Sequence, residues 1–159
     1  MIKLKQLIFE NSSLIFSKPP EEREKLIAAE HYRTIQKYIN SGCKGVLDLE
    51  TSPIKILPDN LTHINGDLYL DESKIENLNN LERVSGNLRL YKCKTLKSLG
   101  KLNYVGEALN LDYTNIQSFE NLKYIGDDLS IHDSKILDVM TEDEIRKLVK
   151  IKGSIFKTD

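Results

Sequence analysis

The stretch INGDLYL, residues 64–70, recurs three more times along the chain at intervals of 20 or 21 residues. Its four versions all begin and end with an aliphatic residue: INGDLYL at 64–70, VSGNLRL at 84–90, VGEALNL at 105–111 and IGDDLSI at 125–131. A unit this short cannot bury its own apolar side. The fixed period therefore predicts one supersecondary unit that is stacked into a solenoid.

Equivalent positions extend the repeat in both directions. One aliphatic per repeat is expected to point inward and stack on its counterparts: Leu47, Leu68, Leu88, Leu109, Leu129 and Ile155. A second inward set is expected at Leu57, Leu78, Leu99, Phe119 and Val139. Small polar residues, which suit tight corners because a short hydroxyl or thiol can hydrogen-bond the backbone, form a third set: Ser52, Ser73, Cys93, Thr114 and Ser134. The pattern predicts a solenoid of about five rungs over residues 43–140.

The run LxLxxSxI, seen at residues 68–75, resembles the leucine-rich repeat family, whose signature has Asn or Cys where this chain has Ser, Cys or Thr. The short unit and the phrase LPDNL at 57–61 are similar to compact bacterial and phage-type repeats. The segment NLKYIGDDLSI at 121–131 is similar to the receptor L-domain. The resemblance implies an α/β solenoid, a right-handed coil with one parallel β-sheet, and we expect a capping helix at each end.

Residues 19–42 are expected to form the N-terminal capping helix. Two prolines precede an acidic first turn, and Ala28, Tyr32, Ile35 and Ile39 fall on one helical face. Residues 1–18 alternate apolar and basic side chains and are compatible with a short strand, a frayed helix or an ordered tail. They do not resemble a secretory signal, because charges interrupt the apolar stretch.

Residues 141–159 are expected to form the C-terminal capping helix and a terminal strand. Thr141 and Glu144 have the spacing of a capping box. Ile145, Leu148 and Val149 are expected to face the core. An alternative for both helices is that their amphipathic faces bind a partner.

Charge and cysteine content bear on partners and compartment. The formal charge of −1 supplies no overall field for nucleic acid or membrane, so we expect neither as a partner. Cys43 and Cys93 lie two rungs apart, which is about 9 to 10 Å at the usual strand spacing and too far for a disulfide. Free, buried thiols suit a reducing compartment, and we expect a cytoplasmic protein of a bacterium or a phage-infected host cell.

An enzyme would need convergent chemistry. His31, His63 and His132 do not share a column, and the chain has no Walker loop, HExxH or CxxC motif. Cys93 could be a nucleophile, but Ser and Thr at the equivalent positions favour a structural corner. We therefore expect no catalysis, no cofactor and no metal site, although activity that depends on His132 would be the sign of an enzyme.

The residues that alternate with the buried leucines are expected to face solvent. Tyrosines beside carboxylates suit contact with a basic or mixed protein partner. The expected partner-binding residues are Asp48, Glu50, Tyr69, Asp71, Arg89, Tyr91, Asn110, Asp112 and His132. A simpler reading is that a sheet facing water needs polar side chains for solubility.

Two functional hypotheses follow from these features. The first is a non-enzymatic protein–protein interaction module that binds its partner through the strand face. The alternative is a structural subunit of a larger bacterial or phage assembly, which docks through the N-terminal segment or the end caps.

Overall fold

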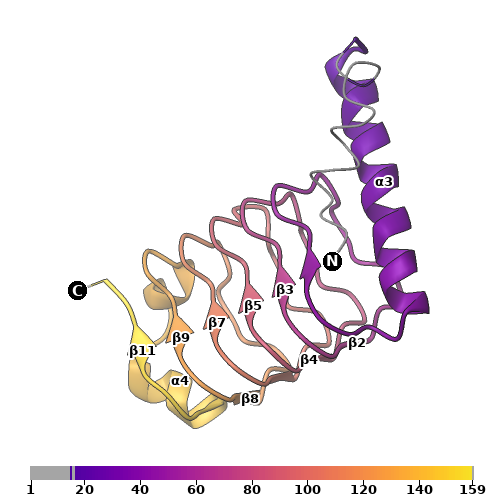
Figure 1. Ribbon diagram of the computed structural model, residues 1–159. Coiled ribbons are helices and arrows are strands. Elements are labelled where there is room, and N and C mark those ends of the chain that lie inside the picture. Colours follow the sequence, from indigo (N-terminus) through magenta and orange to yellow (C-terminus); the bar gives the residue numbers. More distant parts are fainter. Residues whose placement is uncertain (1–14, 16, 159) are drawn as a thin grey trace.

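The chain winds into a β-solenoid with two parallel β-sheets (Figure 1). The computed structural model describes residue 15 and residues 17–158. The expectations for the N-terminal segment 1–18 therefore fall almost entirely outside the described residues.

The first sheet has six parallel strands, one from each successive repeat of the sequence. In spatial order they are β1 (Leu47–Asp48), β3 (Leu68–Tyr69), β5 (Leu88–Arg89), β7 (Leu109–Asn110), β9 (Leu129–Ser130) and β11 (Ile155–Phe156). Their registers pair the first residue of each strand with the first residue of the next. The predicted stacked column of five leucines and Ile155 is thereby confirmed, and all five leucines are buried.

The second sheet has five strands. They are β2 (His63–Ile64), β4 (Arg83–Val84), β6 (Tyr104–Val105), β8 (Tyr124–Ile125) and β10 (Lys150–Ile151). The expectation of one sheet was wrong, because the aliphatic that opens each repeated stretch forms its own parallel ladder before the turn into the six-stranded sheet. From β2 to β10 the chain passes from one strand of this sheet to the next four times. The solenoid therefore makes about four complete turns, whereas about five rungs were expected.

Each turn of the chain leaves the six-stranded sheet through a left-handed residue. Five non-glycine residues at equivalent positions have φ between 49° and 58°: Thr51, Glu72, Lys92, Tyr113 and Asp133. This conformation is uncommon outside glycine, so its recurrence marks a corner that the stack imposes. The residue after each one is a member of the small polar column, and all five of those side chains are buried, as the corner interpretation requires.

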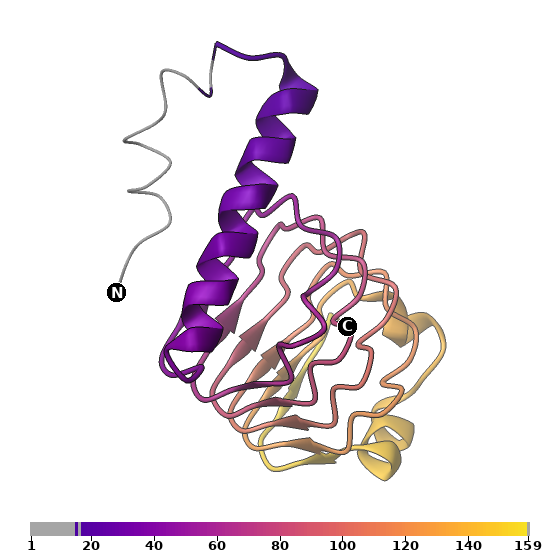
Figure 2. The same ribbon diagram turned by 90° about the vertical axis from the view of Figure 1, so that its right-hand side faces the viewer.

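Helix α3 (Pro20–Asn40) lies against the β1 end of the stack, and its first turns extend beyond the coils (Figures 1 and 2). Its buried residues are His31, Ile35 and Tyr38. The predicted inward position of Tyr32 was wrong: its side chain is 39% exposed and its hydroxyl donates to Ile56 O. The helix is rotated so that His31 contacts Ser52, and Tyr38 Oη donates to Gly45 O.

The last turn is built differently from the others. A 3-10 helix, η1 (Lys135–Asp138), is followed by α4 (Glu142–Leu148), which leads directly into β10. Ile145 and Val149 are buried as predicted, whereas Leu148 is 49% and Val139 is 51% exposed. These helices replace the extended segment of the earlier turns, so Val139 leaves its column and Leu148 lies on the solvent-exposed side of α4.

Both cysteines are free and buried, as predicted. Cys93 Sγ donates to Leu70 O at 2.9 Å, which is the expected role of a small polar corner residue. Within the part of the chain that the structure describes, no helix has the length and apolar character to cross a membrane.

The predicted capping box at the start of α4 is present. Glu144 N donates to Thr141 Oγ1, and Thr141 N donates to the Glu144 carboxylate at 2.8 Å. We expect Thr141→Ala to lower the free energy of unfolding by about 1 kcal/mol, because one first-turn amide loses its acceptor. Thermal unfolding beside Thr62→Ala, an exposed threonine outside any helix, measures the effect. Equal shifts in the two variants would show that the cap does not stabilise the fold.

Candidate functional site

The solvent-facing side of the six-stranded sheet carries most of the expected binding residues, and we call it the acidic face. Its carboxylates outnumber its single arginine by six to one: Asp48, Glu50, Asp67, Asp71, Asp112 and Asp128, against Arg89. The strands supply these side chains because residues that alternate with the buried leucines point away from the core. This face therefore carries a net negative charge.

Four of these carboxylates bind the backbone of the next turn of the chain. Each accepts the N–H of the equivalent residue one turn later, at distances of 2.7 to 3.0 Å: Asp67 from Asn87, Asp71 from Tyr91, Asp112 from His132 and Asp128 from Ser154. The strands are only two residues long, so the flanking amides need other acceptors. The hydrogen bonds fix the carboxylates in place, and the ionised groups still contribute their negative charge to the face.

Asp71 corrects one of the sequence-based expectations. Its side chain was expected to project into solvent, but it is buried, because the carboxylate folds over to accept the Tyr91 amide. Its other oxygen accepts from Arg89 Nη2. Glu50 lies 3.7 Å from the same guanidinium nitrogen, and the Arg89 guanidinium also lies over the Tyr69 ring, 4.9 Å from the ring centroid. Arg89 is thus held in the middle of the face by two acids and one aromatic ring.

A hollow of about 240 Å³ opens beside this cluster. Three of the expected residues line it from adjacent strands, namely Tyr69, Arg89 and Asn110. Tyr69 Oη donates to Asp67 at 3.1 Å. Burial, together with this hydrogen bond, raises the pKa of Tyr69, so the phenol stays a hydrogen-bond donor. The hollow therefore combines an aromatic wall, a cation and an amide.

A second polar cluster lies at the end of the face near β9. Asn110 Nδ2 donates to Asp112 at 3.2 Å, and Ser130 Oγ donates to the other Asp112 oxygen at 2.7 Å. His132 Nδ1 lies 3.3 Å from the same Asp112 oxygen as Ser130. Asn110 thus links the hollow to Asp112 and His132.

The remaining expected residues lie at the borders of the face. Tyr91 packs edge-on against Tyr113 with ring centroids 5.5 Å apart. Asp48 Oδ1 accepts the amide of Glu50 at 3.1 Å. Neither Asp48 nor Tyr91 lines the hollow.

Sequence reasoning missed Ala108, which also lines the hollow. Its counterparts in the neighbouring turns are the larger polar residues Asn87 and Asp128. A small residue in a column of larger ones leaves space, and this break in the repeat is the signal that could have located the hollow.

His31 and Ser52 form a serine–histidine contact that the sequence did not reveal. His31 Nδ1 lies 2.5 Å from Ser52 Oγ, and both side chains are buried between α3 and the first turn. Because both side chains are almost completely buried, the pair joins α3 to the solenoid and does not present a nucleophile to solvent.

In residue 15 and residues 17–158, no three His, Cys, Asp or Glu side chains are grouped so that they could hold a metal ion.

Comparisons of the chain with protein-family models, with curated proteins and with solved structures find no match.

Proposed function

We propose that the protein is a non-enzymatic interaction module that binds a protein partner through the acidic face. The observation that carries this proposal is the hollow bordered by Tyr69, Arg89 and Asn110. Tyrosine and arginine are enriched among the residues that dominate binding energy at protein interfaces. Both are held here by neighbouring side chains, so little conformational freedom is lost when a partner docks.

The size and charge of the site indicate the kind of partner. The hollow of about 240 Å³ is below the roughly 300 to 1,000 Å³ typical of small-molecule pockets, so it suits one side chain inserted by a partner. Six carboxylates around one arginine attract a basic surface. A partner with a basic rim and a protruding side chain fits both features.

Truncation of Tyr69 tests the proposal. We expect Tyr69→Ala to weaken partner binding by about 2 kcal/mol, or roughly 30-fold, because one wall of the hollow is lost. Captured partner is quantified by pull-down from the native cells, and thermal unfolding checks the fold. Tyr32→Ala, on α3, is the matched control. Equal partner capture by the two variants would contradict the proposal.

We also propose that the solenoid is related to the leucine-rich repeats and that α3 and α4 cap its ends. The buried small polar column at the corners supports the first part. The contacts of His31 and Tyr38 with the first turn and the burial of Ile145 support the second. Capping helices would shield terminal turns that have a neighbour on one side only.

A structural subunit of a larger assembly is the second candidate function. It is favoured by apolar side chains that remain half exposed in the last turn, at Val139 and Leu148. Deletion of residues 1–18 separates the two candidates. Loss of assembly with intact partner binding at the acidic face favours the structural role.

A further inference from the structure

The five-stranded sheet carries a continuous stack of side chains on its outer side. Arg83 lies over the Tyr104 ring, with its guanidinium carbon 3.6 Å from the ring centroid. The Tyr104 and Tyr124 rings are nearly parallel, with centroids 4.7 Å apart and an interplanar angle of 7°. Lys152 Nζ lies 5.7 Å from the centroid of the Tyr124 ring. We call these four residues the cationic stack.

The geometry of the solenoid produces this stack. Arg83, Tyr104 and Tyr124 occupy the same position in β4, β6 and β8. Neighbouring strands lie about 4.8 Å apart, which is close to the separation at which planar side chains stack. Three such steps span about 14 Å, the length of about four residues of an extended chain.

The charge of this surface is opposite to that of the acidic face. Residues 62–65, 82–85, 103–106, 123–126 and 149–152 hold four cations, Arg83, Lys123, Lys150 and Lys152, and one carboxylate, Glu82. Among the residues that the structure describes, none of these four cations has a carboxylate within ion-pair distance. Their charge is therefore available to a ligand.

We propose that the cationic stack is a second binding surface, which holds an extended acidic segment of a partner protein. Stacking on Tyr104 orients the Arg83 guanidinium and leaves its N–H edge free to hold a carboxylate in a bidentate pair. Lys152 and Lys123 supply positive charge to further carboxylates along the row. This surface acts independently of the hollow on the acidic face.

The same geometry disfavours single-stranded nucleic acid as the ligand. Proteins bind such strands by stacking bases on open aromatic faces. Both faces of the Tyr104 ring are already covered, by Arg83 and by Tyr124, and Lys152 lies next to the Tyr124 ring. The side-chain carboxylates of an acidic peptide can pair with the cations of the stack and do not need an open aromatic face.

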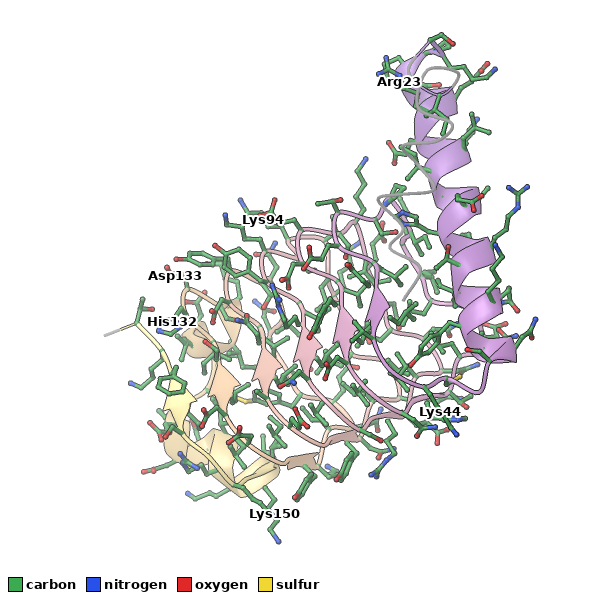
Figure 3. All side chains as sticks on the ribbon, in the orientation of Figure 1. Arg23, Lys44, Lys94, His132, Asp133 and Lys150 are labelled. Carbon is green, nitrogen blue, oxygen red and sulfur yellow. The ribbon has the colours of Figure 1, made fainter. Side chains whose placement is uncertain are left out.

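Fluorescence anisotropy with a labelled octaglutamate peptide and the full chain tests this proposal. We expect saturable binding that Arg83→Gln and Lys152→Gln each weaken about tenfold (about 1.4 kcal/mol). Arg83→Lys keeps the charge but loses the planar fork, so it should also weaken binding several-fold. Lys94→Gln is the matched control, because Lys94 lies at the opposite edge of the molecule from Lys150 (Figure 3).

Several outcomes would overturn the proposal. They are no binding of the peptide, an equal loss of affinity in Lys94→Gln, or an unchanged affinity in both Arg83→Gln and Lys152→Gln. If an oligothymidylate of eight nucleotides binds as tightly as octaglutamate or more tightly, and if its binding depends on Arg83, the surface binds nucleic acid instead. Circular dichroism confirms that each variant is folded, and the two single substitutions at opposite ends of the stack provide independent tests.

Discussion

Leu90→Ala is expected to lower the free energy of unfolding by about 3 kcal/mol, because a fully buried side chain in the middle of the stack leaves a cavity. Leu90 lies between Leu70 and Leu111, the equivalent residues of the adjacent turns, and all three are inaccessible to solvent. A solenoid turn is stabilised mainly by its two neighbours, so a cavity here weakens both interfaces.

Urea unfolding followed by circular dichroism measures the effect of Leu90→Ala. Leu148→Ala is the matched control, because it removes the same atoms from a side chain that is half exposed. The control should cost less than about 1 kcal/mol. If both variants lose the same stability, Leu90 does not occupy a stacked interior column.

Acid is expected to destabilise the fold through His31. Burial, opposed by the smaller attraction of Asp48 and Glu30, lowers the pKa of His31 from 6.5 to about 4. Ser52 Oγ accepts the Ile54 amide, so its hydroxyl proton is free to donate to His31 Nδ1. His31 Nε2 is buried without a hydrogen-bond partner in the described part of the chain. The site therefore suits a neutral imidazole and disfavours the charged form.

The sign of the effect follows from the two pKa values. The unfolded chain binds a proton at His31 more tightly than the folded chain, so the contribution of this residue is complete above pH 6.5. It falls as the pH drops from 6.5 to about 4. A lowered pKa of this size corresponds to about 2 to 3 kcal/mol of stability.

His31→Gln and His63→Gln separate this effect from general acid unfolding. His63 is exposed, so His63→Gln is the control for the loss of stability between pH 7 and pH 4.5. In His31→Gln this loss should shrink by about 2 kcal/mol. Denaturant unfolding at both pH values provides the measurement. An undiminished loss in His31→Gln would show that His31 does not titrate in this range.

The stacked core could be predicted from the sequence, whereas the second sheet could not. The spacing of Leu68, Leu88 and Leu109 repeats once per turn, and only a stacked arrangement buries all three. In the first sheet an outward residue lies between two buried aliphatics, as in Leu68, Tyr69 and Leu70. Each strand of the second sheet contributes a single aliphatic, such as Val105 in β6, so no apolar–polar alternation indicates a strand there.

The sequence did not predict which face of α3 is buried or that Asp71 is buried. Both depend on contacts between residues that are distant in the sequence. Tyr32 and Ile39 fit the helical period as well as His31 and Tyr38 do, and the hydrogen bond between His31 and Ser52 distinguishes the two faces. Asp71 turned inward because a short strand left an amide without an acceptor. Both features join residues about 20 positions apart.

The outward positions of the candidate site could be predicted, but the hollow could not. Alternation with the buried leucines identified Tyr69, Arg89 and Asn110 as outward residues. The space between them depends on the size of Ala108 relative to its neighbours in adjacent turns. Similarly, the stack of Arg83, Tyr104 and Tyr124 becomes visible only when the register of the five-stranded sheet is known.

Hydroxyl-radical footprinting of the protein with its captured partner tests most directly whether the acidic face is the binding surface. Aromatic residues that report on separate surfaces are available: Tyr69 and Tyr91 on the acidic face, Tyr124 on the five-stranded sheet and Tyr32 on α3. Binding of a basic partner at the acidic face predicts that Tyr69 becomes protected from oxidation while Tyr32 does not. Protection of Tyr32 with an unchanged Tyr69 would contradict it.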